Sequence, residues 1–299
     1  MSEDIPRSEG GRFTPVAGLG DRVIGSNPMP QLVPFADLEL ARRLERTEAV
    51  SSARFVEARL RVFPESGATW METAGVYAMF DGPDSPVTQT FGLGLFAPAT
   101  PEVLDQLEDF FHSRGAAVNH EVSPLAGIEL FRLLVERGYR PVEFTSVMFR
   151  TVEDPPEAGR EGIQVRPVGE SEYDLWAGVS AEGWSGGAPE LHGFLLDLGR
   201  VIARKENSPC WLAWLNGEPV AAASLTVCGN TAHMAGACTI RRARGRGAQL
   251  ALLRARLMWA ASQECGLAVM GAAPGTGSQR NAERRGFRIA YTRQKWCKV

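Results

Sequence analysis

The stretch RRARGRGAQLALL, residues 241–253, changes from an arginine- and glycine-rich run to a leucine-rich run within a few residues. A strand is predicted to end near Thr239, just before this stretch, and an amphipathic helix is predicted directly after it. The first backbone N–H groups of a helix have no partner within the helix and carry the positive end of its dipole. A glycine-rich turn between a strand and a helix is therefore suited to an anion such as a diphosphate.

The charge of the chain is unevenly distributed along the sequence. Residues 241–299 contain 13 Lys and Arg and two acids, a net charge of +11, whereas residues 1–240 contain 19 basic and 33 acidic residues, a net charge of -14. This asymmetry leaves two interpretations open, a nucleic-acid surface and a pocket for a phosphorylated small molecule. Because no aromatic stacking residue lies among the arginines, we favour the pocket and expect no nucleic-acid partner.

Composition excludes several other classes of protein. No segment is long and apolar enough to span a membrane, and the N-terminus has no apolar signal region, so we expect a cytoplasmic protein without a membrane partner. All five cysteines lie in the C-terminal half without C-x-x-C spacing, which argues against a disulfide framework and a zinc site. We therefore expect no metal.

The chain is long enough for two domains. We expect a flexible tail at 1–28, one domain at 29–152 and a second at 163–299, separated by the acidic, proline-containing linker 151–162. In the first domain the sequence predicts helices at 37–61, 102–115 and 125–139, and strands at 68–80, 85–96, 116–122 and 142–150.

The second domain shows a similar alternation. Its predicted helices lie at 171–184, 193–205, 249–263 and 278–286. Its predicted strands lie at 163–168, 210–240, 267–273 and 287–296. The segment 210–240 is expected to hold three strands joined by hairpin turns at Asn216-Gly217 and Gly229-Asn230. In both domains a long helix, a buried strand, a short helix and a closing strand follow one another, and the short helix ends in a Gly-aromatic pair, Gly138-Tyr139 or Gly286-Phe287. We predict an α/β fold in which each domain is a mixed sheet flanked by helices.

The run ARGRGAQLALL, followed after a strand by PGTGSQRNAERRGF, resembles the acyl-CoA-binding core of the GCN5-related N-acetyltransferases (GNAT superfamily). That family's signature is Gln/Arg-x-x-Gly-x-Gly/Ala between its fourth strand and third helix. The resemblance covers the C-terminal half and implies a tandem GNAT arrangement whose N-terminal copy is degenerate. It also implies acetyl-CoA, or coenzyme A with another short acyl group, as cosubstrate.

Two registers fit the signature. Arg242-x-x-Gly245-x-Gly247 fits literally, whereas Arg244-x-x-Gly247-x-Gln249 places two leucines eight and nine residues after the arginine, as in the family's helix. We choose the Arg244 register, although Gln249 then replaces the usual Gly or Ala.

By this resemblance, the loop should bind the CoA pyrophosphate and the end of the preceding strand should bind the pantetheine arm. The predicted cofactor-binding residues are Ala237, Cys238, Thr239, Arg244, Gly245, Arg246, Gly247, Ala248 and Gln249. Ser278, predicted to cap the short helix, and Asn281, predicted in its first turn, are added to this set. The N-terminal half has FGLGLFAPATPEVL at the corresponding place, without an arginine, and is not expected to bind CoA in the same way.

The resemblance also nominates catalytic residues. The family's usual base, a carboxylate eleven residues before the signature, corresponds to His233, which could accept a proton near neutral pH or be a structural histidine. The family's usual acid, a tyrosine, corresponds to Ala282, so Tyr291 or solvent is the alternative proton donor. Strict alternation would place Cys238 on the sheet face opposite His233.

The predicted reaction is transfer of an acetyl or short acyl group from CoA to an amine of a small molecule by direct attack in a ternary complex. The missing tyrosine leaves a second hypothesis open, an inactive acyl-CoA sensor or scaffold. Acceptor-pocket candidates are Trp184, Trp211 and Trp214, with Glu182 or Asp197 to attract a cation, although tryptophans more often belong to the core. The oligomeric state cannot be predicted from this sequence.

Overall fold

The computed structural model describes residues 34–152 and 162–299, which belong to one compact unit. The tail predicted at 1–28 and most of the predicted linker lie outside the described residues. Within the described ranges, no helix is long and apolar enough to cross a membrane, and no group of three or more His, Cys, Asp or Glu side chains could hold a metal ion.

Within residues 34–152 and 162–299, eleven strands form one mixed sheet in the order β1-β2-β3-β4-β11-β5-β10-β9-β8-β7-β6. Their bounds are β1 Thr69–Thr73, β2 Val76–Phe80, β3 Gln89–Phe91, β4 Val118–Val122, β5 Arg140–Thr151, β6 Ile163–Pro167, β7 Cys210–Leu215, β8 Glu218–Cys228, β9 Thr231–Thr239, β10 Leu267–Ala272 and β11 Arg288–Lys298. Most neighbours are antiparallel, but β3 with β4 and β9 with β10 are parallel. The predicted mixed α/β fold is confirmed.

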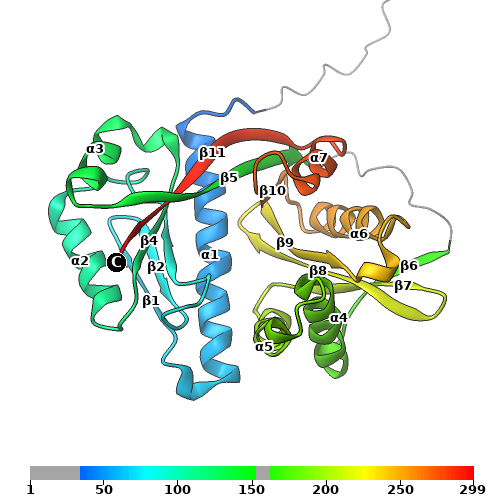
Figure 1. Cartoon of the computed structure of the whole chain (residues 1–299). Helices are drawn as coiled ribbons and strands as arrows, with labels where there is room; N and C mark the ends of the chain where they lie inside the picture. The colour runs from blue at the N-terminus through cyan, green and yellow to red at the C-terminus, as the bar shows by residue number, and fades with distance from the viewer. Residues whose placement is uncertain (1–33, 153–161) are drawn as a thin grey trace, which may run out of the picture. The chain divides into compact units, whose positions relative to one another are not determined.

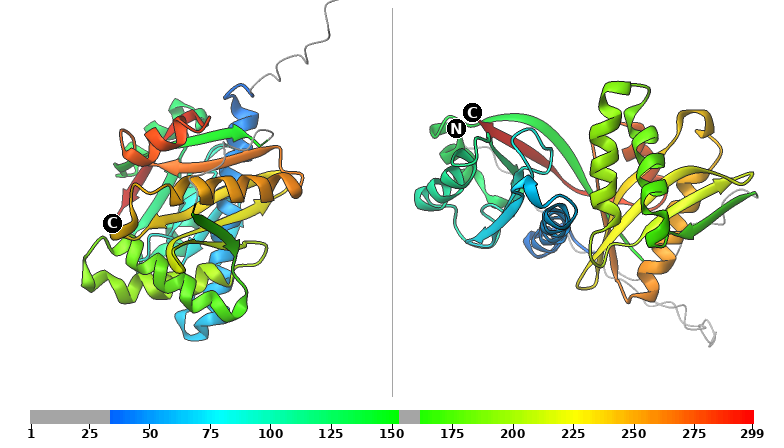
Figure 2. Two further views of the ribbon diagram at one scale, coloured as in Figure 1. Left: turned by 90° about the vertical axis from the view of Figure 1, so that its right-hand side faces the viewer. Right: turned by 90° about the horizontal axis from the view of Figure 1, so that it is seen from below.

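Seven α-helices in the described part of the chain cover this sheet. They are α1 Leu38–Val62, α2 Pro101–His112, α3 Ile128–Glu136, α4 Tyr173–Ser185, α5 His192–Ala203, α6 Ala248–Ser262 and α7 Gly277–Glu283. In the C-terminal half, α4 and α5 lie on one side of strands β7 to β9 and α6 lies on the other side (Figure 1; Figure 2, left). Helix α1 packs against strands from both halves, β2 and β3 as well as β8 and β9.

The last strand of each half is inserted into the sheet of the other half. Strand β11 lies between β4 and β5, and β5 lies between β11 and β10. Figure 1 shows these two long strands, green and red, running side by side. The two halves therefore share one continuous sheet, and neither half can complete its hydrogen-bond pattern without the other.

Two short helices, α3 in the N-terminal half and α7 in the C-terminal half, end in the same way. After α3, Gly138 has a φ of 85° and the N–H of Tyr139 donates to the carbonyl of Leu134. After α7, Gly286 has a φ of 83° and the N–H of Phe287 donates to the carbonyl of Ala282. This bond, reaching five residues back past a left-handed residue, is typical of a helix that stops at a glycine. The predicted Gly-aromatic ends thus have matching geometry in both halves.

Local sequence explains several other boundaries. The side chain of Asp37 accepts a hydrogen bond from the N–H of Leu40 at 2.9 Å and so caps α1. The predicted turn at Asn216-Gly217 joins β7 to β8, with both residues at positive φ (53° and 81°), as a tight two-residue hairpin requires. On α4, Trp176 is fully buried and donates from Nε1 to the carbonyl of Trp211 at 3.1 Å, which anchors this helix to the sheet.

Candidate active site

Strands β9 and β10 separate part of the way along their length. Their parallel pairing ends at Val269 opposite His233, although β9 continues to Thr239 and β10 to Ala272. On its other side, β10 pairs with β5 along its whole length, from Leu267 to Ala272. Backbone polar groups of β9 therefore face a gap in the sheet's hydrogen-bond pattern, where an extended ligand can pair as an added strand.

A β-bulge lies in the separated part of β9. Gly236 and Ala237 together oppose the single residue Ala223 on β8, and Gly236 has a φ of 61°. A Cβ atom at Gly236 would lie 3.1 Å from Ser224 Oγ, so glycine suits both the backbone conformation and the space. A bulge bends its strand, and this one lies in the part of β9 that does not pair with β10.

The bulge changes which side chains share a face. Three pairs of directly opposed residues lie on one face of the β8–β9 hairpin: Thr226 with His233, Ser224 with Ala235, and Ala222 with Cys238. The prediction that Cys238 points away from His233 is therefore wrong, because the extra residue shifts the alternation by one. The Cys238 thiol packs against α4, with Sγ 3.7 Å from the carbonyl oxygen of Ser180, and burial raises its pKa to about 11.

The arginine-glycine loop leads directly into α6. Gly247 has a φ of 99° and occupies the N-cap position, so the helix begins at Ala248, one residue before the predicted start. Within the described residues, the backbone N–H groups of residues 245–250 donate no hydrogen bond. These free donors and the helix dipole form a surface for an anion.

Side chains of the loop tie it to the end of β9. Arg244 Nε donates to the carbonyl of Thr239 at 3.2 Å, and its Nη2 donates to the carbonyl of Gly183 at 3.3 Å. Gln249 Nε2 donates to Thr239 Oγ1 at 2.9 Å. The Gln249 side chain thus turns towards β9, which leaves its backbone N–H free at the helix terminus. Arg246 is exposed and has no side-chain partner in the described part of the chain.

His233 lies where the β9–β10 pairing ends, and its side chain is half-buried. Burial lowers the pKa of its imidazole to about 4, and the nearby cations Lys205, Arg293 and Arg256 lower it further, whereas Glu48 raises it. Its Nδ1 is buried without a hydrogen-bond partner in the described structure. The imidazole is therefore neutral near pH 7, as a general base requires.

Tyr291 lies away from His233. It is on β11, three strands from β9 in the sheet order. Its hydroxyl donates to Glu45 Oε1 at 2.9 Å, its ring is buried, and burial raises its pKa well above the ordinary value. The structure does not bring the two predicted catalytic residues together.

The short helix α7 differs from two predictions. Its N-cap is Thr276, whose hydroxyl accepts from the N–H of Gln279, rather than Ser278. Since the helix begins at Gly277, Asn281 lies in its second turn rather than in its first. Ser278 and Asn281 are exposed, and Ala282 is buried in the core.

A hollow of about 450 Å³ lies beside the loop, between the end of α4 and the turn before Arg244. It is lined by Glu182, Ser185, Gly186, Gly187, Arg241 and Arg242. Glu182 pairs with Arg242 at 2.6 Å, so it is not a free anion for a substrate. Of the three candidate tryptophans, Trp184 is 55% exposed, whereas Trp211 is a core residue and the Arg166 guanidinium covers the ring of Trp214.

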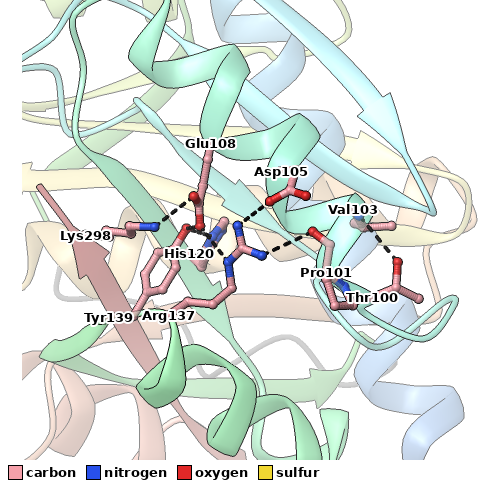
Figure 3. A network of polar contacts seen from close by, with 9 residues as sticks. All are labelled: Thr100, Pro101, Val103, Asp105, Glu108, His120, Arg137, Tyr139 and Lys298. Carbon is pink, nitrogen blue, oxygen red and sulfur yellow. Dashed lines mark hydrogen bonds and ion pairs between the residues drawn. The ribbon is translucent and has the colours of Figure 1, made fainter.

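A second polar cluster lies in the N-terminal half (Figure 3). The Tyr139 hydroxyl donates to Glu108, so the bond between Tyr139 and His120 Nε2 takes its proton from the histidine, and His120 Nδ1 accepts from Thr90. Glu108 also binds Arg137 and Lys298 at 3.0 and 2.8 Å. Since His120 is fully buried with both ring nitrogens satisfied, this cluster is structural.

Sequence reasoning missed a third cluster, centred on Arg293 of β11. This guanidinium is 4% exposed and binds three buried carboxylates, Glu45 at 3.1 Å, Glu48 at 2.9 Å and Glu121 at 2.8 Å. A sequence signal did exist, because helical spacing places Glu45 and Glu48 on the same face of α1 as the apolar residue Leu44. Their partner is some 245 residues away, which no local pattern reveals.

Comparisons with known proteins agree with this geometry. Residues 173–287 match the Acetyltransferase (GNAT) family. No curated protein is significantly similar in sequence.

Solved structures match the described fold over most of its length. A GCN5-related N-acetyltransferase from Kribbella flavida is 15% identical, with 87% of this chain and 95% of that chain covered and a TM-score of 0.62. A GCN5-related N-acetyltransferase from Sphaerobacter thermophilus is 20% identical, with 77% and 75% covered and a TM-score of 0.54. A tandem GNAT protein from the clavulanic acid biosynthesis pathway is 12% identical, with 89% and 97% covered and a TM-score of 0.57. These likenesses show that the chain has the fold of the GCN5-related N-acetyltransferases, and residues 173–287 carry the sequence match to the Acetyltransferase (GNAT) family.

Proposed function

We propose that this protein is an acyl-CoA-dependent N-acetyltransferase that transfers an acetyl or short acyl group to an amine of a small molecule. The single observation that supports this most is the free helix N-terminus of α6 beside the separated strands β9 and β10. The match of residues 173–287 to the Acetyltransferase (GNAT) family supports acyl transfer from CoA in general. The acceptor and the direct ternary-complex mechanism are our inference.

The residues present fit CoA. Backbone N–H groups from Gly245 to Gln249 would bind the pyrophosphate, and the exposed guanidinium of Arg246 would add charge. Residues 237–239 would pair with the pantetheine arm along the unpaired edge of β9. Arg244 and Gln249 would act indirectly, since their side chains hold the loop against Thr239. Ser278 and Asn281 are exposed and would contact the ligand from α7.

His233 would accept the proton that the attacking amine releases. Its neutral imidazole and its place at the start of the strand separation support this role. The buried Ala282 offers no hydroxyl, and the Tyr291 hydroxyl is engaged by Glu45, so we propose that solvent protonates the departing thiolate.

We further propose that the chain is a tandem duplication, with domains at 29–152 and 163–299, and that the N-terminal copy no longer binds CoA in the same way. The matching helix ends of α3 and α7 support the duplication. In the N-terminal half, the loop after β3 buries Leu93 and Leu95 at 1% and 2% exposure. Thr100 caps the next helix, so apolar packing and a side-chain cap replace a free phosphate loop.

Thermal stabilisation by acetyl-CoA tests this function with a matched pair of variants. Gly245 and Gly115 both have positive φ, 75° and 69°, and open space where a Cβ would lie. Gly245→Val and Gly115→Val should therefore impose similar backbone strain, but only Gly245→Val should lose most of the stabilisation by ligand. CoA release with a panel of small amines then tests turnover. Equal stabilisation of both variants contradicts the site, and binding without turnover on any amine favours the sensor.

A further inference from the structure

Helix α1 of the N-terminal half lies directly against the β8–β9 hairpin that carries His233. Arg43 Nε donates to Thr231 Oγ1 at 2.6 Å, Ser51 Oγ donates to Thr226 Oγ1 at 3.1 Å, and Arg54 Nη1 donates to the carbonyl of Val227 at 2.7 Å. These contacts fix which turns of α1 face which residues of the hairpin.

Glu48 belongs to the turn of α1 that faces His233. It is three residues before Ser51 and so lies on the same side of the helix. Ser51 contacts Thr226, which lies directly opposite His233 and shares its face of the sheet. Consistent with this, Glu48 and His233 each change the pKa of the other.

Both side chains have one atom without a partner in the described structure. His233 Nδ1 and Glu48 Oε1 are buried and make no hydrogen bond. Water does not reach this carboxylate freely, because Glu48 is only 6% exposed. The other Glu48 oxygen, Oε2, accepts from Arg293 Nη2 at 2.9 Å, which orients the carboxylate. Leaving two buried polar atoms unsatisfied is unfavourable, and one water that accepts from Nδ1 and donates to Oε1 would satisfy both.

We propose that Glu48 is a positioning residue for His233: one bridging water accepts the proton on Nδ1 and donates to Glu48 Oε1, which leaves Nε2 as the free basic nitrogen. This inference rests on the proposed role of His233 as base. It gives the N-terminal half a part in the reaction, because α1 supplies the group that sets the tautomer of the base. Arg293 in turn forms an ion pair with Glu48. The series of contacts Arg293–Glu48–His233 therefore connects β11, α1 and β9.

Four charged side chains from other parts of the fold change the pKa of His233. Glu48 on α1 favours the imidazolium, whereas Lys205 after α5, Arg293 on β11 and Arg256 on α6 oppose it. Loss of Glu48 should therefore lower the pKa of His233 and also allow the imidazole to adopt the Nε2–H tautomer.

Nitrogen-15 NMR of histidine-labelled protein tests the proposal without any substrate. The chain has four histidines, and His233→Gln assigns the signal. In wild type we expect His233 to carry its proton on Nδ1, opposite to free imidazole side chains, which prefer Nε2. His120 is an internal reference with its proton on Nε2. In Glu48→Met the His233 signal should move towards the Nε2–H form.

Glu121→Met is the matched control. Like Glu48→Met, it removes one of the three carboxylates on Arg293, but it should leave the His233 tautomer unchanged. If Glu48→Met does not fold, Glu48→Gln, which keeps the shape and loses the charge, should shift the same signal part of the way. A wild-type His233 protonated on Nε2, or a tautomer that does not respond to Glu48, overturns the proposal.

Kinetics separate this proposal from the proposed function. With the fastest amine of the panel, Glu48→Gln should lower kcat about 10- to 100-fold with little change in KM for acetyl-CoA. It should also move the acid limb of the rate profile to lower pH. In a His233→Ala background the same change should have no further effect. If His233→Ala is inactive and Glu48→Gln is normal, only the positioning role fails; if His233→Ala is fully active, the base assignment fails.

Discussion

The hydroxyl of Tyr291 donates a hydrogen bond to Glu45 at 2.9 Å, which joins the last strand of the chain to the first helix across 246 positions of sequence. Arg293, two residues further along β11, binds the same carboxylate oxygen. Burial raises the pKa of Glu45 to about 7, and Arg293 opposes that effect. The stability of the shared sheet therefore depends on one buried cation that balances several acids.

Replacing Arg293 should be strongly destabilising. Arg293→Met leaves Glu45, Glu48 and Glu121 buried with one fewer cation, and breaking a buried ion pair from one side costs about 3–5 kcal/mol. Urea unfolding measures this loss. The control Arg132→Met removes an exposed pair with Glu129 and should cost less than about 1 kcal/mol. A similarly small effect at Arg293 would contradict the importance of the cluster.

His120 should make the protein sensitive to acid. Burial lowers the pKa of His120 from 6.5 to about 3. Between these two pH values, His120 is protonated in the unfolded chain but neutral in the folded protein. This contribution is fully present above pH 6.5 and is lost as the pH falls towards 3, with a slope of about 1.4 kcal/mol per pH unit for one proton. Unfolding free energies at several pH values should show a shallower slope for His120→Gln, and an unchanged slope would contradict the assignment.

Cys238 should be dispensable for chemistry although it shares a face with His233. Burial raises the pKa of its thiol to about 11, so almost no thiolate is present at neutral pH. Cys238→Ala should keep acyl transfer, and iodoacetamide should label Cys238 more slowly than the partly exposed Cys228. Accumulation of an acylated Cys238 would instead indicate a covalent mechanism.

Arg246 should contribute to acyl-CoA affinity and little to stability. It is exposed and has no side-chain partner in the described ranges, so Arg246→Ala should raise the Kd for acetyl-CoA by about fivefold, or about 1 kcal/mol, at low salt. Isothermal titration calorimetry measures the Kd of each variant for acetyl-CoA. Arg288→Ala removes another exposed arginine of the basic C-terminal segment and should change the Kd much less, unless net charge alone attracts the ligand.

Much of the fold was predictable because its signals are local. The α1 cap at Asp37, the hairpin turn at Asn216-Gly217 and the glycine at the start of α6 are each set by a few neighbouring residues. The site was predictable in outline through the strand, loop and helix order.

Two features could not be predicted, each for a physical reason. The bulge at Gly236 is set by pairing with β8, and a simple alternation of side chains missed it and so misplaced Cys238. The exchange of β5 and β11, with the Arg293 cluster, depends on contacts between residues far apart in sequence. Glu48 could be recognised as a neighbour of His233 only once α1 was packed on the hairpin.

The exchanged strands also constrain how the chain is made. On the ribosome, β4 emerges long before its neighbour β11, so the central part of the sheet has to wait for the eleven residues of β11. Such long-range pairing slows folding and leaves strand edges open in the meantime. A stop codon just before Arg288 would therefore remove a single strand from the product but deprive both β4 and β5 of a partner, and the truncated chain should be degraded as an unfolded protein.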